Sequence, residues 1–195
     1  MINETIAVVL GYILGSIPSA FIIGRLMGKI DVRQEGDGRI SASAVHKRLG
    51  VVPFVLVVIM DVGEGVLAVL IARMLTESLT VEMIAGFAAV VGHNWSVFLK
   101  FKGGLGATTT YGVLVSLVWW QFLAVAAAVF ILFLIMKRKK SGLSTAILII
   151  GLSIVLLIQY LFQNAPLILA IYPFILILLM VLKRFQISRT VPVES

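Results

Sequence analysis

Apolar runs of membrane-crossing length follow one another along almost the whole chain, and they constrain the fold more than any other feature. They lie at about residues 6–26, 51–75, 81–99, 107–136, 143–162 and 167–182. About 20 apolar residues cross a bilayer as an α-helix, and only helices or closed barrels satisfy their backbone hydrogen bonds in lipid. The sequence therefore predicts an all-α polytopic integral membrane helical bundle, with residues 1–195 as a single transmembrane domain.

Composition agrees with this class and excludes others. The mean hydropathy is +1.12, and only 13% of residues are charged, which is typical of polytopic membrane proteins. The absence of cysteine excludes a disulfide framework and a thiolate metal site. No basic residue precedes the first apolar run, so we expect that run to be retained rather than cleaved as a signal peptide.

The distribution of Lys and Arg predicts about seven crossings with the N-terminus outside. Splitting the run 107–136 at Trp119–Trp120 gives this number, and fifteen of the sixteen Lys and Arg then lie on inner segments. Six crossings would separate residues 137–140 from the other basic segments. Positive residues mark the cytoplasmic side, which favours seven crossings and makes 28–50 a polar cytoplasmic loop. The net charge of +7 then follows from topology, and no nucleic-acid partner is expected.

Two polar interruptions near the N-terminus predict local structure. In the first run, the small residues around Pro18 predict a kinked helix with close helix contacts, or alternatively a functional segment. In the loop, the Gly36–Gly38 turn is followed by hydroxyl and small residues, which predicts a short helix with Lys47 and Arg48 near its end. A plain solvated loop is the alternative.

Asp61 and Glu64 lie near the middle of the run 51–75, and their spacing places them on one helix face. Carboxylates inside a membrane span face protein or water and are functional by default. His93, Lys100 and Lys102 are the candidate partners, because neighbouring carboxylates resist ionising together without a cation nearby. A structural ion pair is the equal alternative.

A glycine-rich stretch with basic residues, Gly92 to Gly106, follows the third run. Gly103, Gly104 and Gly106 lack a Cβ, so their backbone N–H groups can stay bare and let a ligand approach. Nearby lysines suit a phosphate. A tight turn with its lysines as positive-inside anchors is the simpler alternative on spacing alone.

Several blocks in one order resemble the acyl-phosphate-dependent glycerol-3-phosphate acyltransferases of bacterial membranes, the PlsY family. Residues 15–21 match its GSIPSAY, and residues 36–44 lie where the family has GSGNIGATN. Residues 61–65 lie at its DxxKG, and residues 92–106 at its GH…FKGGKG. The resemblance covers nearly the whole chain.

The resemblance implies seven spans with an outside N-terminus in the bacterial cell membrane. It implies transfer of an acyl chain from acyl phosphate to glycerol 3-phosphate, which gives lysophosphatidic acid for phospholipid biosynthesis. Neither an organic cofactor nor a metal is implied, and a monomer is compatible with this interpretation. It places His93 and Asp61 at the catalytic centre. The candidate substrate-binding residues on this interpretation, including cations relocated from the family's positions, are Gly103, Gly104, Gly106, Lys102, Gly36, Gly38, Arg39, Ser43, Lys47, Thr109 and Arg184.

The departures from the family pattern fall at its polar positions. Leu105 and Glu64 replace two family lysines. The other replaced positions are Asp37, Arg39, Ala44, Lys183 and Gln186. These changes predict altered substrate or reduced activity. The alternative hypothesis is a catalytically silent paralog that binds lipid or a partner protein. A small transporter finds little support, because intramembrane polar residues are few and no inverted repeat is visible.

Overall fold

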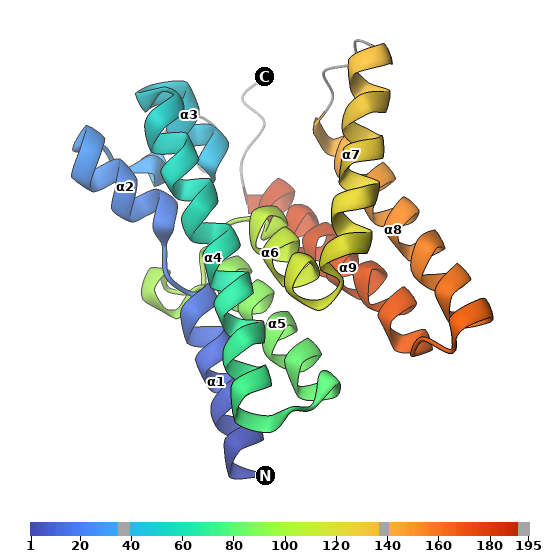
Figure 1. Cartoon of the computed structure of the whole chain (residues 1–195). Helices are drawn as coiled ribbons and strands as arrows, with labels where there is room; N and C mark the ends of the chain where they lie inside the picture. The colour runs from blue at the N-terminus through green and yellow to red at the C-terminus, as the bar shows by residue number, and fades with distance from the viewer. Residues whose placement is uncertain (35–39, 137–140, 191–195) are drawn as a thin grey trace. The chain divides into compact units, whose positions relative to one another are not determined.

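Every regular element that the computed structural model describes, over residues 1–34, 40–136 and 141–190, is helical. The all-α bundle predicted from the sequence is therefore confirmed. The longer helices in Figure 1 are α1 (Ile2–Gly15), α2 (Ser19–Gly28), α3 (Ala42–Leu49), α4 (Val51–Thr76), α5 (Leu79–Asn94), α6 (Ala107–Leu117), α7 (Trp119–Met136), α8 (Ser141–Gln163) and α9 (Leu167–Thr190). Single 3₁₀ turns form at Val32–Gln34 and Val97–Leu99.

Within those described residues, three helical stretches are long and apolar enough to cross a membrane, namely Ile2–Gly28, Val51–Thr76 and Leu167–Ser188. Shorter apolar helices occupy Ala107–Leu117, Trp119–Leu132 and Ile147–Gln163. This pattern is that of a multi-pass membrane protein. The count of seven crossings and the outside N-terminus stay predictions.

Helix boundaries differ from the apolar runs where backbone chemistry intervenes. The first run is broken rather than kinked, because α1 ends before Pro18 and α2 begins after it. The third run stops being α-helical at Asn94 and continues as a turn. The split of 107–136 at Trp119 is confirmed. The last helix was expected to end near Leu182, but it continues to Thr190.

The chain divides into two compact units, Met1–Val113 with Leu179–Ser195, and Leu114–Leu178. In the second unit α7 packs against α8, and Gln121 Nε2 donates a 2.9 Å hydrogen bond to Gln159 Oε1. Such interhelical bonds pair polar groups that lipid cannot satisfy. The single transmembrane domain expected over residues 1–195 stays a prediction.

In the first unit α1, α4 and α5 pack against one another (Figure 1). Small residues set the distance between α1 and α5. A Cβ on Gly11 would collide with the carbonyl oxygen of Ala85, and a Cβ on Gly15 with that of Ala89. Glycines four residues apart let membrane helices approach to backbone contact. This close contact anchors the end of α5 that leads into the glycine-rich turn.

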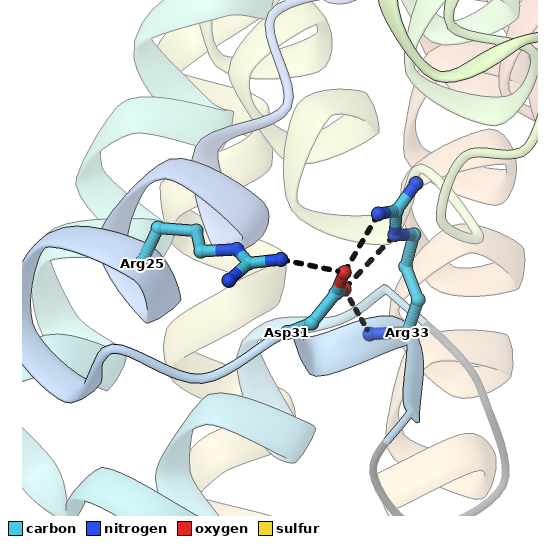
Figure 2. Close-up of polar contacts among 3 residues, drawn as sticks. All are labelled: Arg25, Asp31 and Arg33. Carbon is cyan, nitrogen blue, oxygen red and sulfur yellow. Dashed lines mark hydrogen bonds and ion pairs between the residues drawn. The ribbon is translucent and has the colours of Figure 1, made fainter.

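The predicted short helix in the polar segment is confirmed as α3, whose first turn is capped by Ser41 Oγ accepting from the Ala44 N–H at 3.2 Å. Beside it, Asp31 accepts hydrogen bonds from Arg25 and Arg33 (Figure 2). The hydrogen bonds from Arg33 hold the pKa of Asp31 well below its usual range. Both guanidiniums also lie over the Phe21 ring, so the segment between α2 and α3 is tied to α2.

Candidate active site

A pocket in the first unit gathers four segments that are far apart in the sequence. It is lined by the end of α1 and the start of α2, by Ile40 and Ser41 ahead of α3, by Asp61 of α4, and by the end of α5 with its following turn. The lining residues are Gly15, Ile17, Pro18, Ser19, Ala20, Ile40, Ser41, Asp61, His93, Ser96, Leu99, Gly103 and Gly104. The expected meeting of the glycine turn with the polar segment is confirmed for Ile40 and Ser41.

Asp61, on α4, is buried in the wall of this pocket. Ser19 Oγ donates to Asp61 Oδ1, and Thr108 Oγ1 donates to Asp61 Oδ2 at 2.8 Å. The carboxylate therefore links α2, α4 and α6 through two hydroxyl groups. The lysines suggested from the sequence are not its partners, because Lys100 and Lys102 are both exposed.

Glu64 follows one turn later on α4 and lies against His93 of α5. His93 Nδ1 and Glu64 Oε2 are 3.4 Å apart, which is long for a charged pair. Glu64 is only 5% exposed. Its other oxygen, Oε1, is buried and has no hydrogen-bond partner among the described residues. The predicted contact between His93 and this carboxylate face is thus confirmed, but it leaves Glu64 incompletely satisfied.

The glycine turn is held against the end of α5 by main-chain hydrogen bonds. The Gly103 N–H donates to the Asn94 carbonyl at 3.1 Å, and the Gly104 N–H donates to the His93 carbonyl at 3.0 Å. The expectation that these two amides stay bare for a ligand is therefore wrong. The glycines are required for close approach instead, since a Cβ on Gly104 would lie 2.6 Å from His93 Nε2 and 2.8 Å from the Ile40 carbonyl oxygen.

Unpaired buried polar atoms also lie beside Gly106. Asn94 is fully buried, and neither atom of its amide has a hydrogen-bond partner within the described ranges. Gly106 has a φ of +72°, and a Cβ there would lie 2.5 Å from Asn94 Oδ1. Thr109 and Thr110, in the first turn of α6, are fully buried with unpaired hydroxyls. Buried polar groups are normally paired, so this region has capacity to bind water or ligand.

The C-terminal part of α9 contacts the turn after α5. Gln186 Oε1 accepts from Trp95 Nε1 at 2.9 Å and from Lys183 Nζ at 3.3 Å. Lys183 is buried, and its Nζ lies 5.1 Å from the centre of the Trp95 ring. Two positions that depart from the family pattern, Lys183 and Gln186, therefore both contact Trp95.

The predicted site residues are only partly brought together. Asp61, His93, Gly103 and Gly104 line the pocket. Gly106 lies next to Asn94 at the end of α5, and Thr109 lies in α6. The exposed members Lys102, Ser43, Lys47 and Arg184 are absent from the pocket lining. Gly36, Gly38 and Arg39, together with Asp37, lie outside the described residues.

Sequence reasoning missed the hydroxyl groups of the site. Ser19 and Thr108 bind Asp61, while Ser41 and Ser96 line the pocket. Ser41 Oγ lies 3.0 Å from Ser43 Oγ, so Ser43, which was predicted as a site residue, contacts a residue that lines the pocket. The sequence offered one indication of Ser19, its position directly after Pro18. However, the small residues of that segment were explained equally well by close helix packing.

Fold and site together define a multi-pass helical membrane protein with a polar pocket walled by an aspartate, a histidine and a glycine turn. The family profile described as glycerol-3-phosphate acyltransferase matches residues 5–191. The chain therefore belongs to the glycerol-3-phosphate acyltransferase family, and the resemblance drawn from its motifs is confirmed.

Individual relatives agree with this membership. The chain is 39% identical to "Glycerol-3-phosphate acyltransferase 2" of Moorella thermoacetica over 64% of this chain and 66% of that protein. It is 36% identical to "Glycerol-3-phosphate acyltransferase" of Synechococcus sp. strain CC9902, over 80% of this chain and 78% of that protein. A crystal structure of PlsY, an integral membrane glycerol 3-phosphate acyltransferase in its glycerol 3-phosphate form, superposes with a TM-score of 0.80 at 28% identity, covering 95% of this chain and 90% of that one.

Proposed function

We propose that this chain transfers an acyl group from acyl phosphate to the 1-hydroxyl of glycerol 3-phosphate at a bacterial plasma membrane. A new ester bond forms between the hydroxyl oxygen and the acyl carbon, and the bond from that carbon to the phosphate oxygen breaks. The products are lysophosphatidic acid and inorganic phosphate, which also takes up the hydroxyl proton. A mixed anhydride is already activated, so the protein needs mainly to position both reactants and stabilise developing charge.

The observation that carries this proposal is the shared pocket of Asp61, His93 and the Gly103–Gly104 turn. The lining of this pocket includes residues of all four blocks of the family pattern, from residues 15–21 to residues 92–106. The pocket also holds Ser41, directly before the helix that carries Lys47. We assign Asp61 and His93 to the reacting centre, and Ser41 with the glycine turn to substrate positioning.

Phosphate binding is assigned to hydroxyl and cationic side chains. The Gly103 and Gly104 amides are engaged, so we assign this role to the hydroxyls of Ser41 and Ser43, to Lys47 and Arg184, and to Arg39, which stands where the family has Asn. Gly106 and Thr109 are assigned to the same ligand through the unpaired groups at the start of α6. The chain is proposed to act as a monomer.

The test is an acyltransferase assay on the purified full chain in detergent, with acyl phosphate and glycerol 3-phosphate as substrates. Lysophosphatidic acid is expected above the level of a matched preparation from cells that lack the chain. His93→Ala is expected to reduce its formation at least tenfold, within the range by which single acid–base or electrostatic groups act. Product no higher than the background would overturn the proposal.

A second candidate is a silent paralog that binds lipid or a partner protein, and one observation favours it. Among the described residues that line the pocket, none is a lysine or an arginine, although the reaction involves two phosphates. The double variant Leu105→Lys with Glu64→Lys separates the candidates. Activity that appears from none supports the silent paralog, whereas loss of existing activity supports a rearranged site.

A further inference from the structure

We propose that Asp61, Glu64 and His93 bind one divalent transition-metal ion, such as Mn²⁺ or Zn²⁺, in the wall of the pocket. Each of these side chains offers one ligand atom, and the three atoms lie within 4.8 Å of one another. Two carboxylate oxygens and one imidazole nitrogen form a ligand set that both ions accept. The three residues come from two helices, α4 and α5, that pack directly against each other.

A second observation points to a ligand rather than to a closed ion pair. Glu64 Oε1 is buried and has no hydrogen-bond partner among the described residues, although the side chain is only 5% exposed. A carboxylate oxygen in this state loses its hydration without compensation. The 3.4 Å separation of His93 Nδ1 from Glu64 Oε2 leaves that interaction weak as well. A cation held between them would satisfy both groups.

Hydrogen bonds from two neighbouring hydroxyl groups already orient the Asp61 carboxylate. Both oxygens of Asp61 accept hydrogen bonds from hydroxyl groups, one from Ser19 and one from Thr108. Hydrogen bonds to ligating carboxylates fix their direction and are usual around metal centres. Because Asp61 and His93 line the pocket, an ion held by them would be accessible to a ligand in the pocket.

The charge of the pocket gives the ion a role, and this step rests on the proposed function. A phosphate in the pocket would face the Asp61 carboxylate, while none of the described lining residues is a lysine or an arginine. A divalent ion would neutralise the two carboxylates, Asp61 and Glu64, and would offer a coordination position to a phosphate oxygen. The ligand class is therefore a phosphate oxygen of acyl phosphate or of glycerol 3-phosphate.

The experiment measures metal binding directly. The full chain is purified in detergent, stripped with EDTA and titrated with Mn²⁺ alone while free Mn²⁺ is followed by electron paramagnetic resonance. We expect about one Mn²⁺ per chain, and at least tenfold weaker binding in Glu64→Gln. The matched control is Glu82→Gln, another buried carboxylate on the same helix as His93 but paired with Arg73. It is expected to bind Mn²⁺ like the unmodified chain.

A spectroscopic measurement keeps the proposal testable if Glu64→Gln does not fold. Pulsed electron paramagnetic resonance of the Mn²⁺-loaded unmodified chain is expected to show coupling to an imidazole nitrogen, from His93. No stoichiometric Mn²⁺ binding, no imidazole coupling, or equal affinity in Glu64→Gln would each overturn the site, as would an equal loss in Glu82→Gln.

Parallel acyltransferase assays separate this inference from the proposed function. Mn²⁺ binding without lysophosphatidic acid formation leaves the metal site standing and removes the proposed function. Full activity in EDTA-stripped protein that binds no Mn²⁺ removes the metal site and leaves the function. If both hold, Glu64→Lys is expected to lose Mn²⁺ binding because a lysine ammonium cannot be a ligand while it is protonated.

Discussion

The same two helices, α4 and α5, carry two buried carboxylates, Glu82 and Glu64, each paired with a basic side chain. The two differ in how fully their oxygens are hydrogen-bonded. At one end, Arg73 reaches Glu82 Oε2 through two donors, Nε at 3.1 Å and Nη2 at 2.7 Å. At the other end, Glu64 meets His93 at 3.4 Å and keeps one buried oxygen unpaired. A guanidinium paired with a carboxylate forms strong, charge-assisted bonds. The first pair is therefore structural, whereas the second has unused capacity for a ligand.

This difference separates stability from function along a single helix pair. Changes near Arg73 and Glu82 are expected to alter unfolding and leave catalysis intact. Changes near His93 are expected to alter catalysis first, because the pocket lies there and its groups are not saturated by internal contacts. Two substitutions test this contrast, and two more set it against polar contacts elsewhere in the chain; they follow in order of expected effect.

The largest effect is expected from Gly104→Ala. The added Cβ would lie 2.6 Å from His93 Nε2 and 2.8 Å from the Ile40 carbonyl oxygen, so the imidazole or the turn must move. A displacement of about 1 Å at a reacting centre reduces rates by about 100-fold. We expect a fall of this size in kcat/KM for lysophosphatidic acid formation.

Gly63→Ala provides the matched control, since a Cβ at Gly63 on α4 would meet no atom within 4 Å. It is expected to retain activity and to raise the free energy of unfolding by about 0.5–1 kcal/mol, the usual gain from alanine in a helix. Unchanged kcat/KM in Gly104→Ala would contradict the placement of the turn against His93.

The next effect concerns stability at the other end of the helix pair. Arg73→Ala leaves the Glu82 carboxylate buried without its guanidinium, which we expect to lower the free energy of unfolding by about 1–3 kcal/mol. Chemical unfolding in detergent, followed by tryptophan fluorescence, measures the change. Activity below the unfolding transition should stay within twofold of the unmodified chain.

Glu77→Gln serves as the control, since Glu77 is exposed and lies at the end of α4, four residues after Arg73. It is expected to change neither the free energy of unfolding nor the activity. The contrast between the two ends would break down if Arg73→Ala remained fully folded and lost activity.

A smaller effect is expected for the neutral pair between α7 and α8. Gln121→Leu removes the 2.9 Å hydrogen bond to Gln159. Interhelical hydrogen bonds in membrane proteins are worth about 0.6 kcal/mol on average. A double-mutant cycle with Gln159→Leu measures this coupling in the unfolding free energy. The exposed Gln163→Leu is the control, and a coupling near zero would show that the bond is not stabilising.

The smallest effect is expected for the cluster in which the buried Asp31 carboxylate meets two half-exposed arginines, Arg25 and Arg33 (Figure 2). Arg33 lowers the pKa of Asp31 below its usual value, so the carboxylate stabilises the folded state above the unfolded pKa of about 3.9. That stability is lost progressively as the pH falls further. We expect Asp31→Asn to lower the Tm slightly at pH 7, with a difference that shrinks below about pH 4.

The exposed Glu4→Gln is the control for that series and is expected to leave the Tm unchanged across the same pH range. A difference between Asp31→Asn and the unmodified chain that grows on acidification would contradict the stated direction of the pKa shift.

Much of the fold could be predicted because a continuous apolar run of helix length can be recognised from the sequence alone. Apolar runs predicted the helices of the bundle, and the Trp119–Trp120 pair located the split between α6 and α7. Helix ends were less predictable where contacts decide them. Asn94 ends α5 inside an apolar run because its carbonyl is used by Gly103 in the following turn.

For the site, residue identity and spacing were sufficient to name His93 among the candidate partners of the two carboxylates, but not to find the hydrogen-bond partners of Asp61. Spacing at i and i+3 places Asp61 and Glu64 on one face of α4. Ser19 and Thr108 come from other helices, and no local pattern reports which hydroxyl group packs against a given carboxylate. The same limit explains why the sequence predicted bare amides in the glycine turn. The Gly103 and Gly104 N–H groups instead donate to backbone carbonyls at the end of α5.

By itself the sequence determined that this protein is a helical membrane protein of the glycerol-3-phosphate acyltransferase family, because hydrophobic length and ordered motifs are local properties of a chain. Only the tertiary structure decided which polar groups are satisfied. Hydrogen-bond partners of buried side chains come from distant segments. Whether Glu82 is paired by Arg73 and whether Glu64 keeps an unpaired oxygen therefore depend on how α4 and α5 pack.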